Sequence, residues 1–340
     1  MSLRETDQLS FADALSFKRA GLNERLGRIA ALIDWVALDK LLEPLRPERR
    51  GAPGYAPLLL FKAVLLAQWN GLSDEAMEEM LADRLSFQDF CGLGLADPKP
   101  DHSTLWRFRE ALAESGLVDA LFQEINRQLG DHGFFLRQGT LIDATLVAAQ
   151  ATAPPAQPAV PPVEGEAAPS RLVASETDPD ATWTRRGKSR FFGYKGHVAV
   201  DQKSGLIRAQ LFTGADVNET MVADALIMGD EKAVYADKAY HTHARTALLK
   251  ERRIKNRIQQ RPNKHHQLTP RQSLRNRLIG HIRGRVETVF AYLKRICGYR
   301  RVRYFSKARN AVQFALLCTA YNLNKATRTA YNLNKATRTA

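Results

Sequence analysis

Three acidic residues stand out by their sequence contexts as candidates for catalytic or binding chemistry. Asp143 interrupts residues 140–147, an apolar and β-branched run that is typical of a buried strand. Asp237 ends a second strand-like run, VYAD, and Glu287 lies in a basic helical segment. Because an unpaired carboxylate among apolar neighbours costs several kcal/mol, we expect a partner group or a bound cation to neutralise Asp143.

Each acid taken alone also has an ordinary structural interpretation, as a salt-bridge partner or a helix cap. For Glu287 this alternative is specific, because Arg283, Glu287 and Lys294 fall within a stripe about 40° wide at about 100° per residue. An Arg283–Glu287 pair at this spacing would stabilise a helix by only a few tenths of a kcal/mol. We expect Glu287 at the edge of the core, about 90° from an apolar face that comprises Val286, Val289, Phe290, Leu293 and Ile296.

The elements around these acids indicate a mixed α/β domain that follows a helical one. Apolar residues recur at helical spacing between residues 10 and 130, whereas strand-like and helical runs alternate from Gly139 onward. The expected strands are 140–147, 192–201, 206–213 and 233–237, and the expected helices are 242–252, 274–297 and 309–323. The sequence therefore predicts domains at 1–135 and 136–325, with a proline-rich loop at 151–180.

The chain ends in a duplicated decapeptide. The sequence YNLNKATRTA occupies residues 321–330 and again residues 331–340. In one continuous helix the second copy would be turned by about 280° relative to the first, so the two copies could not bury the same face. We interpret residues 326–340 as a tail without a function of its own.

The charge of the chain is strongly uneven. The net charge is +14, yet residues 1–250 contain 28 Lys and Arg against 34 Asp and Glu. Residues 251–340 contain 22 against 2. Such a basic segment is either a solvated face or a site for a polyanion, because each cation that neutralises a phosphate releases condensed counterions. The steep imbalance favours nucleic acid, with phosphate contacts from Arg253, Arg257, Arg261, Arg275 and Arg277.

Composition argues against several other classes of protein. The three cysteines are scattered without Cys-x-x-Cys spacing, which disfavours a disulfide framework or a zinc cluster. The histidine pairs at 241/243 and 265/266 lack a third ligand at suitable spacing. No apolar run reaches the roughly 18–20 residues of a transmembrane helix, and the first residues are unlike a signal peptide. We therefore expect a cytoplasmic protein.

The three acidic contexts, LIDATLV, VYADKAY and RGRVETVFAYLKR, resemble the catalytic blocks of bacterial insertion-sequence transposases of the DDE class. The resemblance is to the insertion-sequence-5 group of the insertion-sequence-4 superfamily, whose third block is Tyr, two residues, Arg, three residues, Glu, six residues, Lys. Arg283, Glu287 and Lys294 stand at these offsets, with Gly280 in place of the tyrosine. Upstream, GYAPLLLFKAVLLAQWNGLSDEAMEEML and PDHSTLWRFRE resemble the helical amino-terminal domain of these enzymes, so the resemblance covers residues 15–325.

This resemblance implies an α-helical amino-terminal domain and an α/β RNase H-like catalytic domain with a mixed sheet. It also implies two Mg²⁺ ions, replaceable by Mn²⁺, held by Asp143, Asp237 and Glu287 as catalytic residues. Arg283 and Lys294 would hold phosphates near the scissile bond. Water would free a 3′-OH at the element end, and that 3′-OH would attack target DNA. The implied partners are double-stranded DNA and further copies of the chain, in a dimer or larger assembly at the bacterial nucleoid, without a membrane.

Some assignments remain open at the level of sequence. Lys195 and His197 lie in a GYKGH segment that resembles the family's hairpin, where they face DNA or form ordinary hairpin surface. Trp183 stacks on an unpaired base or packs within the protein. Two other functions are compatible with the sequence: a catalytically silent DNA-binding derivative of a transposase, and a same-fold nuclease that cuts without joining.

Overall fold

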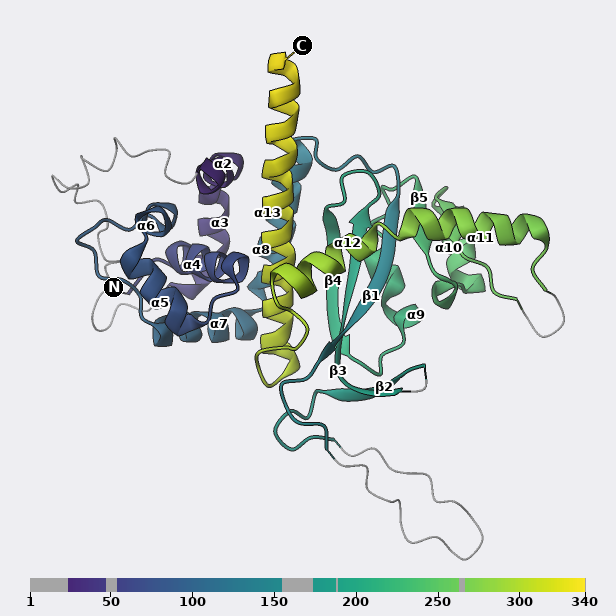
Figure 1. The fold of residues 1–340 in the computed structure, drawn as a ribbon, viewed down its shortest axis with the longest axis horizontal. Helices are drawn as coiled ribbons and strands as arrows, with labels where there is room; N and C mark the ends of the chain where they lie inside the picture. Colours follow the sequence, from purple (N-terminus) through teal and green to yellow (C-terminus); the bar gives the residue numbers. More distant parts are fainter. Residues whose placement is uncertain (1–23, 47–53, 155–173, 188, 263–266, 340) are drawn as a thin grey trace, which may run out of the picture. The chain divides into compact units, whose positions relative to one another are not determined.

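The structure of the chain, a computed structural model, describes residues 24–46, 54–154, 174–187, 189–262 and 267–339 (Figure 1). The chain forms two compact units, Met1–Leu136 with Ala315–Ala340, and Arg137–Phe314. The predicted proline-rich loop lies largely outside the described residues, as do His265 and His266. Among the described residues, no helix combines the length and apolar character needed to cross a membrane.

The first unit is helical, as the sequence predicts. Its helices before residue 136 are α2 (Glu24–Leu32), α3 (Trp35–Leu41), η2 (Glu43–Leu45), α4 (Pro57–Asn70), α5 (Asp74–Asp83), α6 (Leu85–Cys91), α7 (His102–Ser115) and α8 (Leu117–Asp131). Polar side chains start three of these helices: Asp34, Ser73 and Asp101 accept hydrogen bonds from the first turns of α3, α5 and α7. Such caps satisfy N–H groups that have no partner inside the helix.

The last helix, α13 (Lys307–Thr339), completes the core of the helical unit. Trp69 of α4 donates from Nε1 to the carbonyl oxygen of Ala320 (2.7 Å), and Asn322 donates to Asn126 of α8 (2.8 Å). Because the apolar residues from Ala315 onward are buried in this unit, the structure divides the chain after Phe314 and not at residue 325. The backbone of α13 continues through both copies of the decapeptide, where the sequence was interpreted as a tail.

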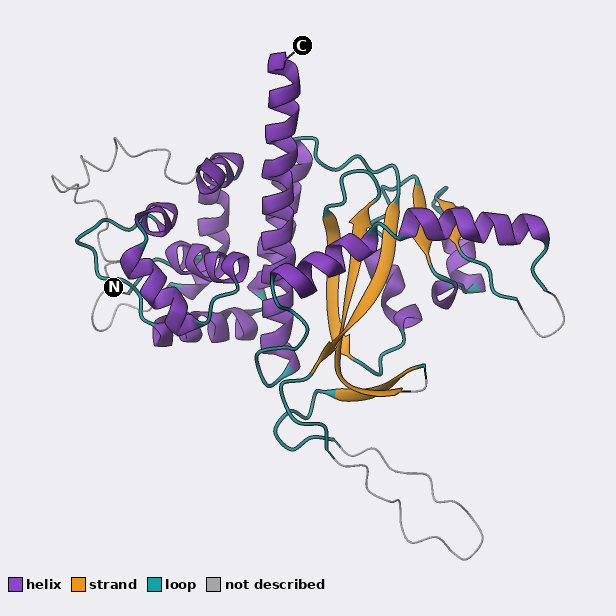
Figure 2. Ribbon diagram, viewed as in Figure 1, coloured by secondary structure: helices purple, strands orange, loops and turns teal. Residues whose placement is uncertain are grey.

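The second unit is built on a six-stranded mixed sheet, drawn in orange in Figure 2. Its strands are β1 (Thr140–Ala148), β2 (Thr182–Arg186), β3 (Ser189–Asp201), β4 (Ile207–Gly214), β5 (Ala233–Ala236) and β6 (Lys255–Ile258). β3 pairs antiparallel with β1, β2 and β4, whereas β5 pairs parallel with both β1 and β6. The order β4-β3-β1-β5-β6 is that of an RNase H-like domain, which confirms the predicted fold class.

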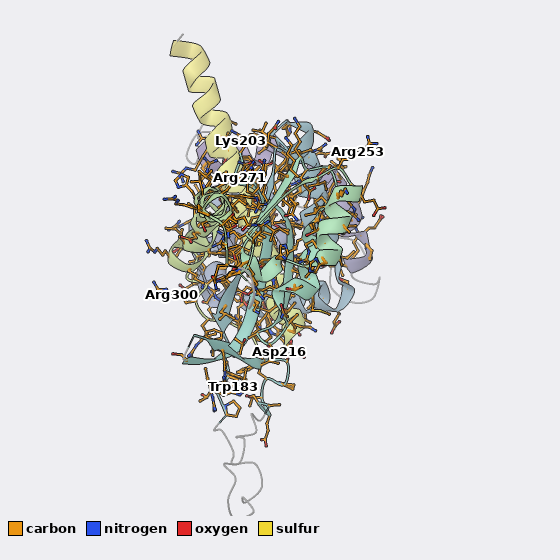
Figure 3. The ribbon with its side chains drawn as sticks, turned by 90° about the vertical axis from the view of Figure 1, so that its right-hand side faces the viewer. Trp183, Lys203, Asp216, Arg253, Arg271 and Arg300 are labelled. Atoms are coloured by element: carbon orange, nitrogen blue, oxygen red, sulfur yellow. The ribbon has the colours of Figure 1, made fainter. Side chains whose placement is uncertain are left out.

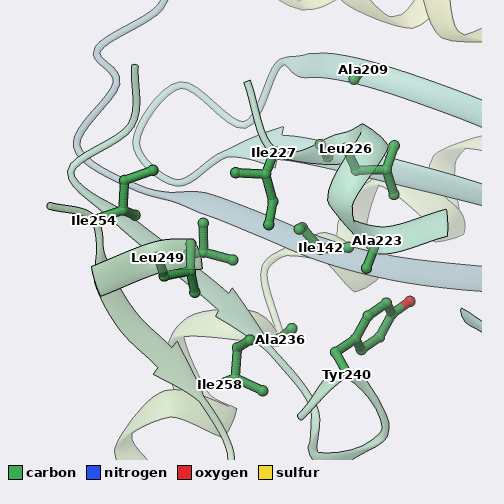
Figure 4. Packing of buried hydrophobic residues seen from close by; sticks show 12 residues of the cluster. Ile142, Ala209, Ala223, Leu226, Ile227, Ala236, Tyr240, Leu249, Ile254 and Ile258 are labelled. Atoms are coloured by element: carbon green, nitrogen blue, oxygen red, sulfur yellow. The ribbon is translucent and has the colours of Figure 1, made fainter. Parts of the chain in front are cut away.

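A hydrophobic cluster covers one face of this sheet (Figure 4). Its helical side comprises η3 (Ala223–Leu226), η4 (Lys238–Tyr240) and α10 (His243–Glu251), and the short helix α9 (Glu219–Val222) leads into η3. Ile142 of β1 packs in the cluster with Leu226 and Leu249. Because side chains alternate along a strand, Asp143 lies on the other face, where α12 (Val286–Ala291) contacts β1.

The predicted helix 274–297 is divided into three elements. They are α11 (Pro270–Arg283), α12 and a π-helical turn, η5 (Tyr292–Ile296). Gly284 and Arg285 join α11 to α12 by a tighter turn, in which the N–H of Arg285 reaches the carbonyl of Ile282. Glycine weakens a helix at such a point because it lacks a side chain and gains backbone freedom when unfolded. The predicted helical segment is therefore interrupted by a turn at Gly284 and Arg285 and ends in a π-helical turn.

Candidate catalytic site

Asp143 lies in the middle of the central strand with both carboxylate oxygens engaged. Oδ1 accepts the N–H of Ala144 (2.9 Å), and Oδ2 accepts Nη1 of Arg283 (2.5 Å). The side chain is only 17% exposed. Burial is the main cause that raises the pKa of Asp143 to about 6; the charges of Asp237 and Glu219 act in the same direction, and Arg283 and Ala144 oppose it. The partner that the sequence required for this acid is therefore Arg283.

Asp237 follows β5 directly, beside the strand that carries Asp143. Its Oδ1 accepts the N–H of Ala239 (2.6 Å), so the carboxylate caps the short helix η4. β1 and β5 are parallel neighbours, and the charge of Asp237 raises the pKa of Asp143. The structure thus brings the first two predicted acids into one electrostatic environment at the end of β5.

Glu287 is exposed in the first turn of α12. Among the described residues it does not form a group of three potential metal-binding side chains with the two aspartates. The turn at Gly284 and the π-helix η5 remove the single stripe that a straight helix would give Arg283, Glu287 and Lys294. Arg283 pairs with Asp143, and Lys294 donates from Nζ to the carbonyl oxygen of Leu146 (3.0 Å). Within the described part of the chain, no ion pair joins Arg283 to Glu287, so the simple helix-pair alternative was wrong.

Sequence reasoning missed two residues beside the aspartates, Glu219 and Tyr240. The carboxylate of Glu219 lies 3.6 Å from Nζ of Lys195. Tyr240 is 1% exposed, and its hydroxyl has no hydrogen-bond partner among the residues that the structure describes. Burial raises the pKa of Tyr240, with further contributions from Glu219, Asp143 and Asp237. Only the position of Tyr240, three residues after Asp237, could have signalled it from the sequence.

Lys195 and Trp183 both contact other residues of the protein. Lys195 is buried and donates to the carbonyl oxygen of Val217 (2.8 Å), so it is not hairpin surface. His197 is also buried, with Nε2 3.0 Å from the hydroxyl oxygen of Thr213. Trp183 packs its ring on Phe192 across the β2–β3 pair, with centroids 5.2 Å apart. Figure 3 shows Trp183 and Asp216 at the same end of the unit.

The predicted basic residues divide into four exposed arginines and one structural arginine. Arg253, Arg257, Arg261 and Arg277 are exposed; Arg253, labelled in Figure 3, projects from the unit. Arg275 instead donates to the carbonyl oxygens of Asn256 and Ile258 and fastens α11 to β6. The charges of Arg261 and Arg275 help to lower the pKa of His241, after burial and His243. Because His241 follows the turn that Asp237 caps, positive charge lies close to that acid.

Two family models match the sequence. The model described as "Transposase DDE domain" matches residues 135–323, more than half of the chain, and the model described as "Transposase domain (DUF772)" matches residues 15–111. The chain belongs to the DDE transposase family. Among solved structures, the transposase is similar to the cryo-EM structure of piggyBac transposase synaptic complex with hairpin DNA. The sequences are 10% identical, the TM-score is 0.39, and the match covers 94% of this chain and 76% of that chain.

DDE transposases generally use divalent metal ions, and the donor atoms of this site fit such ions. Asp143 and Asp237 supply carboxylate oxygens, which hard cations such as Mg²⁺ prefer. Among the described residues, however, no three His, Cys, Asp or Glu side chains are arranged to hold a metal. The two aspartates are therefore candidate ligands for a divalent ion.

The raised pKa of Asp143 predicts a pH-dependent contribution to stability. Between the unfolded value near 4 and the folded value of about 6, the folded chain keeps a proton that the unfolded chain loses. This contribution therefore falls by about 3 kcal/mol as pH rises through that window, and it is constant above it. Burial lowers the pKa of His197 to about 4, so the contribution of His197 to the free energy of unfolding rises with pH. The pH dependence of the wild type alone therefore does not separate the contribution of Asp143.

The measurement is urea unfolding of the wild type and the Asp143→Asn variant at several pH values between 4 and 7.5. The variant retains His197 but lacks the titrating carboxylate. We expect the stability of the wild type minus that of the variant to decrease as pH rises from 4 to 6. Parallel pH profiles for the two proteins would show that Asp143 titrates in its ordinary range.

Proposed function

We propose that this DDE transposase cleaves the ends of its insertion element and joins the freed 3′-OH ends to target DNA. The observation that carries the proposal is the pair Asp143 on β1 and Asp237 directly after β5, the parallel neighbour of β1 in the matched DDE domain. The family match supports this class of reaction, and the position of the two acids on neighbouring parts of the sheet supports their joint role. The insertion-sequence-5 assignment, from the spacing of Arg283, Glu287 and Lys294, is part of this proposal.

Asp143, Asp237 and Glu287 would hold two Mg²⁺ ions, with Mn²⁺ as a substitute. When bound, such ions stabilise the attacking and leaving oxygens of an in-line displacement at phosphorus. Asp143 is suited to contact both ions because it lies on the central strand, and Asp237 and Glu287 would each complete one ion's ligands. Glu287 is exposed in the first turn of α12, the helix that contacts β1, and would join the two aspartates when metal ions and DNA bind.

The cationic side chains would position DNA against these acids. The exposed arginines Arg253, Arg257, Arg261 and Arg277 would contact phosphates, supplying affinity without base specificity. Arg283 and Lys294 would lie nearest to the scissile phosphate, where an arginine offers a planar, two-pronged donor. Arg275, Lys195 and Trp183 would support this surface from within through their contacts to β6, Val217 and Phe192.

Joining two element ends requires that both be held at once, so the active form would be a dimer or larger assembly on DNA. Its site of action would be the bacterial nucleoid, where the element and its targets lie. A same-fold nuclease would cleave the element ends but would not join them to target DNA. A catalytically silent derivative would bind DNA without cleaving or joining it.

The test uses the purified full chain, Mg²⁺, a labelled duplex that carries the sequences flanking the gene, and a supercoiled target plasmid. We expect labelled duplex ends to become covalently joined to the plasmid, because a freed 3′-OH attacks a target phosphate. Cleavage without joined product would identify the nuclease instead. Binding without cleavage in Mg²⁺ or Mn²⁺ would identify the silent derivative.

A further inference from the structure

We propose that Arg283 is a positioning residue that exchanges between Asp143 and a DNA phosphate, so that metal ions and DNA bind cooperatively. The inference rests on the proposed function, since it assumes that Asp143 is a metal ligand and that Arg283 faces DNA. It adds a defined order to the site. In the free chain Arg283 occupies Asp143, and DNA removes Arg283 to make room for a cation.

The contacts of Asp143 leave little room for a cation beside Arg283. Oδ2 is bonded to Nη1 of Arg283 at 2.5 Å, and Oδ1 is bonded to the N–H of Ala144 at 2.9 Å. Both members of the Arg283–Asp143 pair are largely buried, with side chains 22% and 17% exposed. A guanidinium held on Oδ2 repels a divalent ion at the same carboxylate, so Arg283 competes with the metal for Asp143.

The guanidinium of Arg283 nevertheless does not use all of its hydrogen-bond donors, and a phosphate would be a better partner for it than Asp143. Its buried Nε has no hydrogen-bond partner among the residues that the structure describes. A phosphate accepts two parallel N–H bonds from a guanidinium, which is a stronger arrangement than the single bond to Asp143. Arg283 is also the last residue of α11, the helix that carries the exposed Arg277. DNA that contacts Arg277 would therefore lie on the helix that ends at Arg283.

Removal of Arg283 leaves a negative charge that a divalent cation can balance. Asp143 would then face the charges of Asp237 and Glu219 without an opposite charge on its own oxygens. A buried carboxylate without a partner is strongly unfavourable, so the departure of Arg283 promotes metal entry. The next turn of the chain carries Glu287, the acid that is exposed in the free chain. In this exchange Glu287 would complete the donor set once Arg283 has left Asp143.

Thermodynamic linkage makes this exchange measurable without catalysis. If DNA binds Arg283 and the metal binds the carboxylate that Arg283 leaves, each ligand tightens the binding of the other by the same factor. A typical coupling is about 10-fold. Mn²⁺ binding to the full chain can be followed by the electron paramagnetic resonance signal of the free ion. DNA binding can be followed by fluorescence anisotropy with Ca²⁺ present or absent, at constant ionic strength.

Three variants separate the possible results. Arg283→Gln should bind Mn²⁺ about 10-fold more tightly than the wild type without DNA, and its DNA affinity should no longer respond to Ca²⁺. Arg283→Lys keeps the charge and should bind Mn²⁺ as weakly as the wild type, which controls for the loss of the side chain's packing. Arg277→Gln should weaken DNA binding without changing the Mn²⁺ affinity of the DNA-free chain. Melting temperatures establish that each variant is folded.

An Arg283→Gln variant that binds Mn²⁺ no more tightly than the wild type would overturn the exchange and leave the metal site intact. Failure of the proposed function gives a different result. In that case Mn²⁺ binding would be insensitive to Asp143→Asn in every variant, with or without DNA. The comparison with Asp143→Asn also removes the contribution of Mn²⁺ that binds to the DNA itself.

Discussion

Replacing Asp143 by asparagine is expected to lower the rate of Mg²⁺-dependent DNA cleavage and joining by about 10²–10³-fold or more, in line with the loss of one preorganised charge-stabilising group. The substitution keeps the shape of the side chain and its place on the central strand. It removes the negative charge that a divalent cation requires from its ligand. Asp237→Asn should have an effect of the same order, because both acids lie in one electrostatic environment.

The effect on catalysis should be separable from an effect on folding or on DNA binding. Circular dichroism and the melting temperature report whether Asp143→Asn folds, since Arg283 loses its ion-pair partner in this variant. A matched control is Glu251→Gln, which neutralises an exposed acid at the end of α10. We expect the control to cleave and join at the wild-type rate. An Asp143→Asn protein that also did so would remove this acid from the proposed mechanism.

The central strands could be predicted from the sequence because their runs of apolar residues are buried in the folded sheet. Asp143 stands in a β-branched apolar run, and such a run is stable only as a buried strand, here with Arg283 on the acid. Strand β6, in contrast, has the sequence KNRI, with exposed side chains at its first and third positions. An edge strand buries few side chains. The sequence of β6 therefore has the composition of a basic surface segment, and it was interpreted as one.

Other features depended on tertiary contacts that no local pattern encodes. The periodicity of residues 309–323 predicted a helix but not its partners, and from Ala315 onward that helix packs in the helical unit. Arg283 and Glu287 have a spacing that suits an ion pair, yet Asp143 lies far away in sequence and takes Arg283 instead. Glu219 stands in a polar turn without any motif, so only the fold reveals that it lies near the aspartates.

Reversing the charges of Arg257 and Arg261 is expected to weaken DNA binding by about 10²-fold near 0.1 M salt, because each contributes a phosphate contact. Both side chains are exposed. Arg257 lies on β6 opposite Tyr235 of β5, and the charge of Arg261 reaches His241, beside the turn that Asp237 caps. DNA that passes over these arginines would therefore bring a phosphate toward Asp237. The slope of log affinity against log salt should fall by about two units.

The matched control for Arg257→Glu with Arg261→Glu is Lys232→Glu with Lys250→Glu, which changes the net charge by the same amount. Lys232 precedes β5, at the end opposite Asp237, and Lys250 lies on α10, on the face opposite Asp143. We expect this control to keep most of the affinity and the full salt slope in anisotropy titrations. If both double variants weakened binding equally, net charge alone would explain the effect. A loss confined to the arginine pair would instead define the path of DNA toward Asp237, because these two cations lie on and just after β6, the strand beside β5.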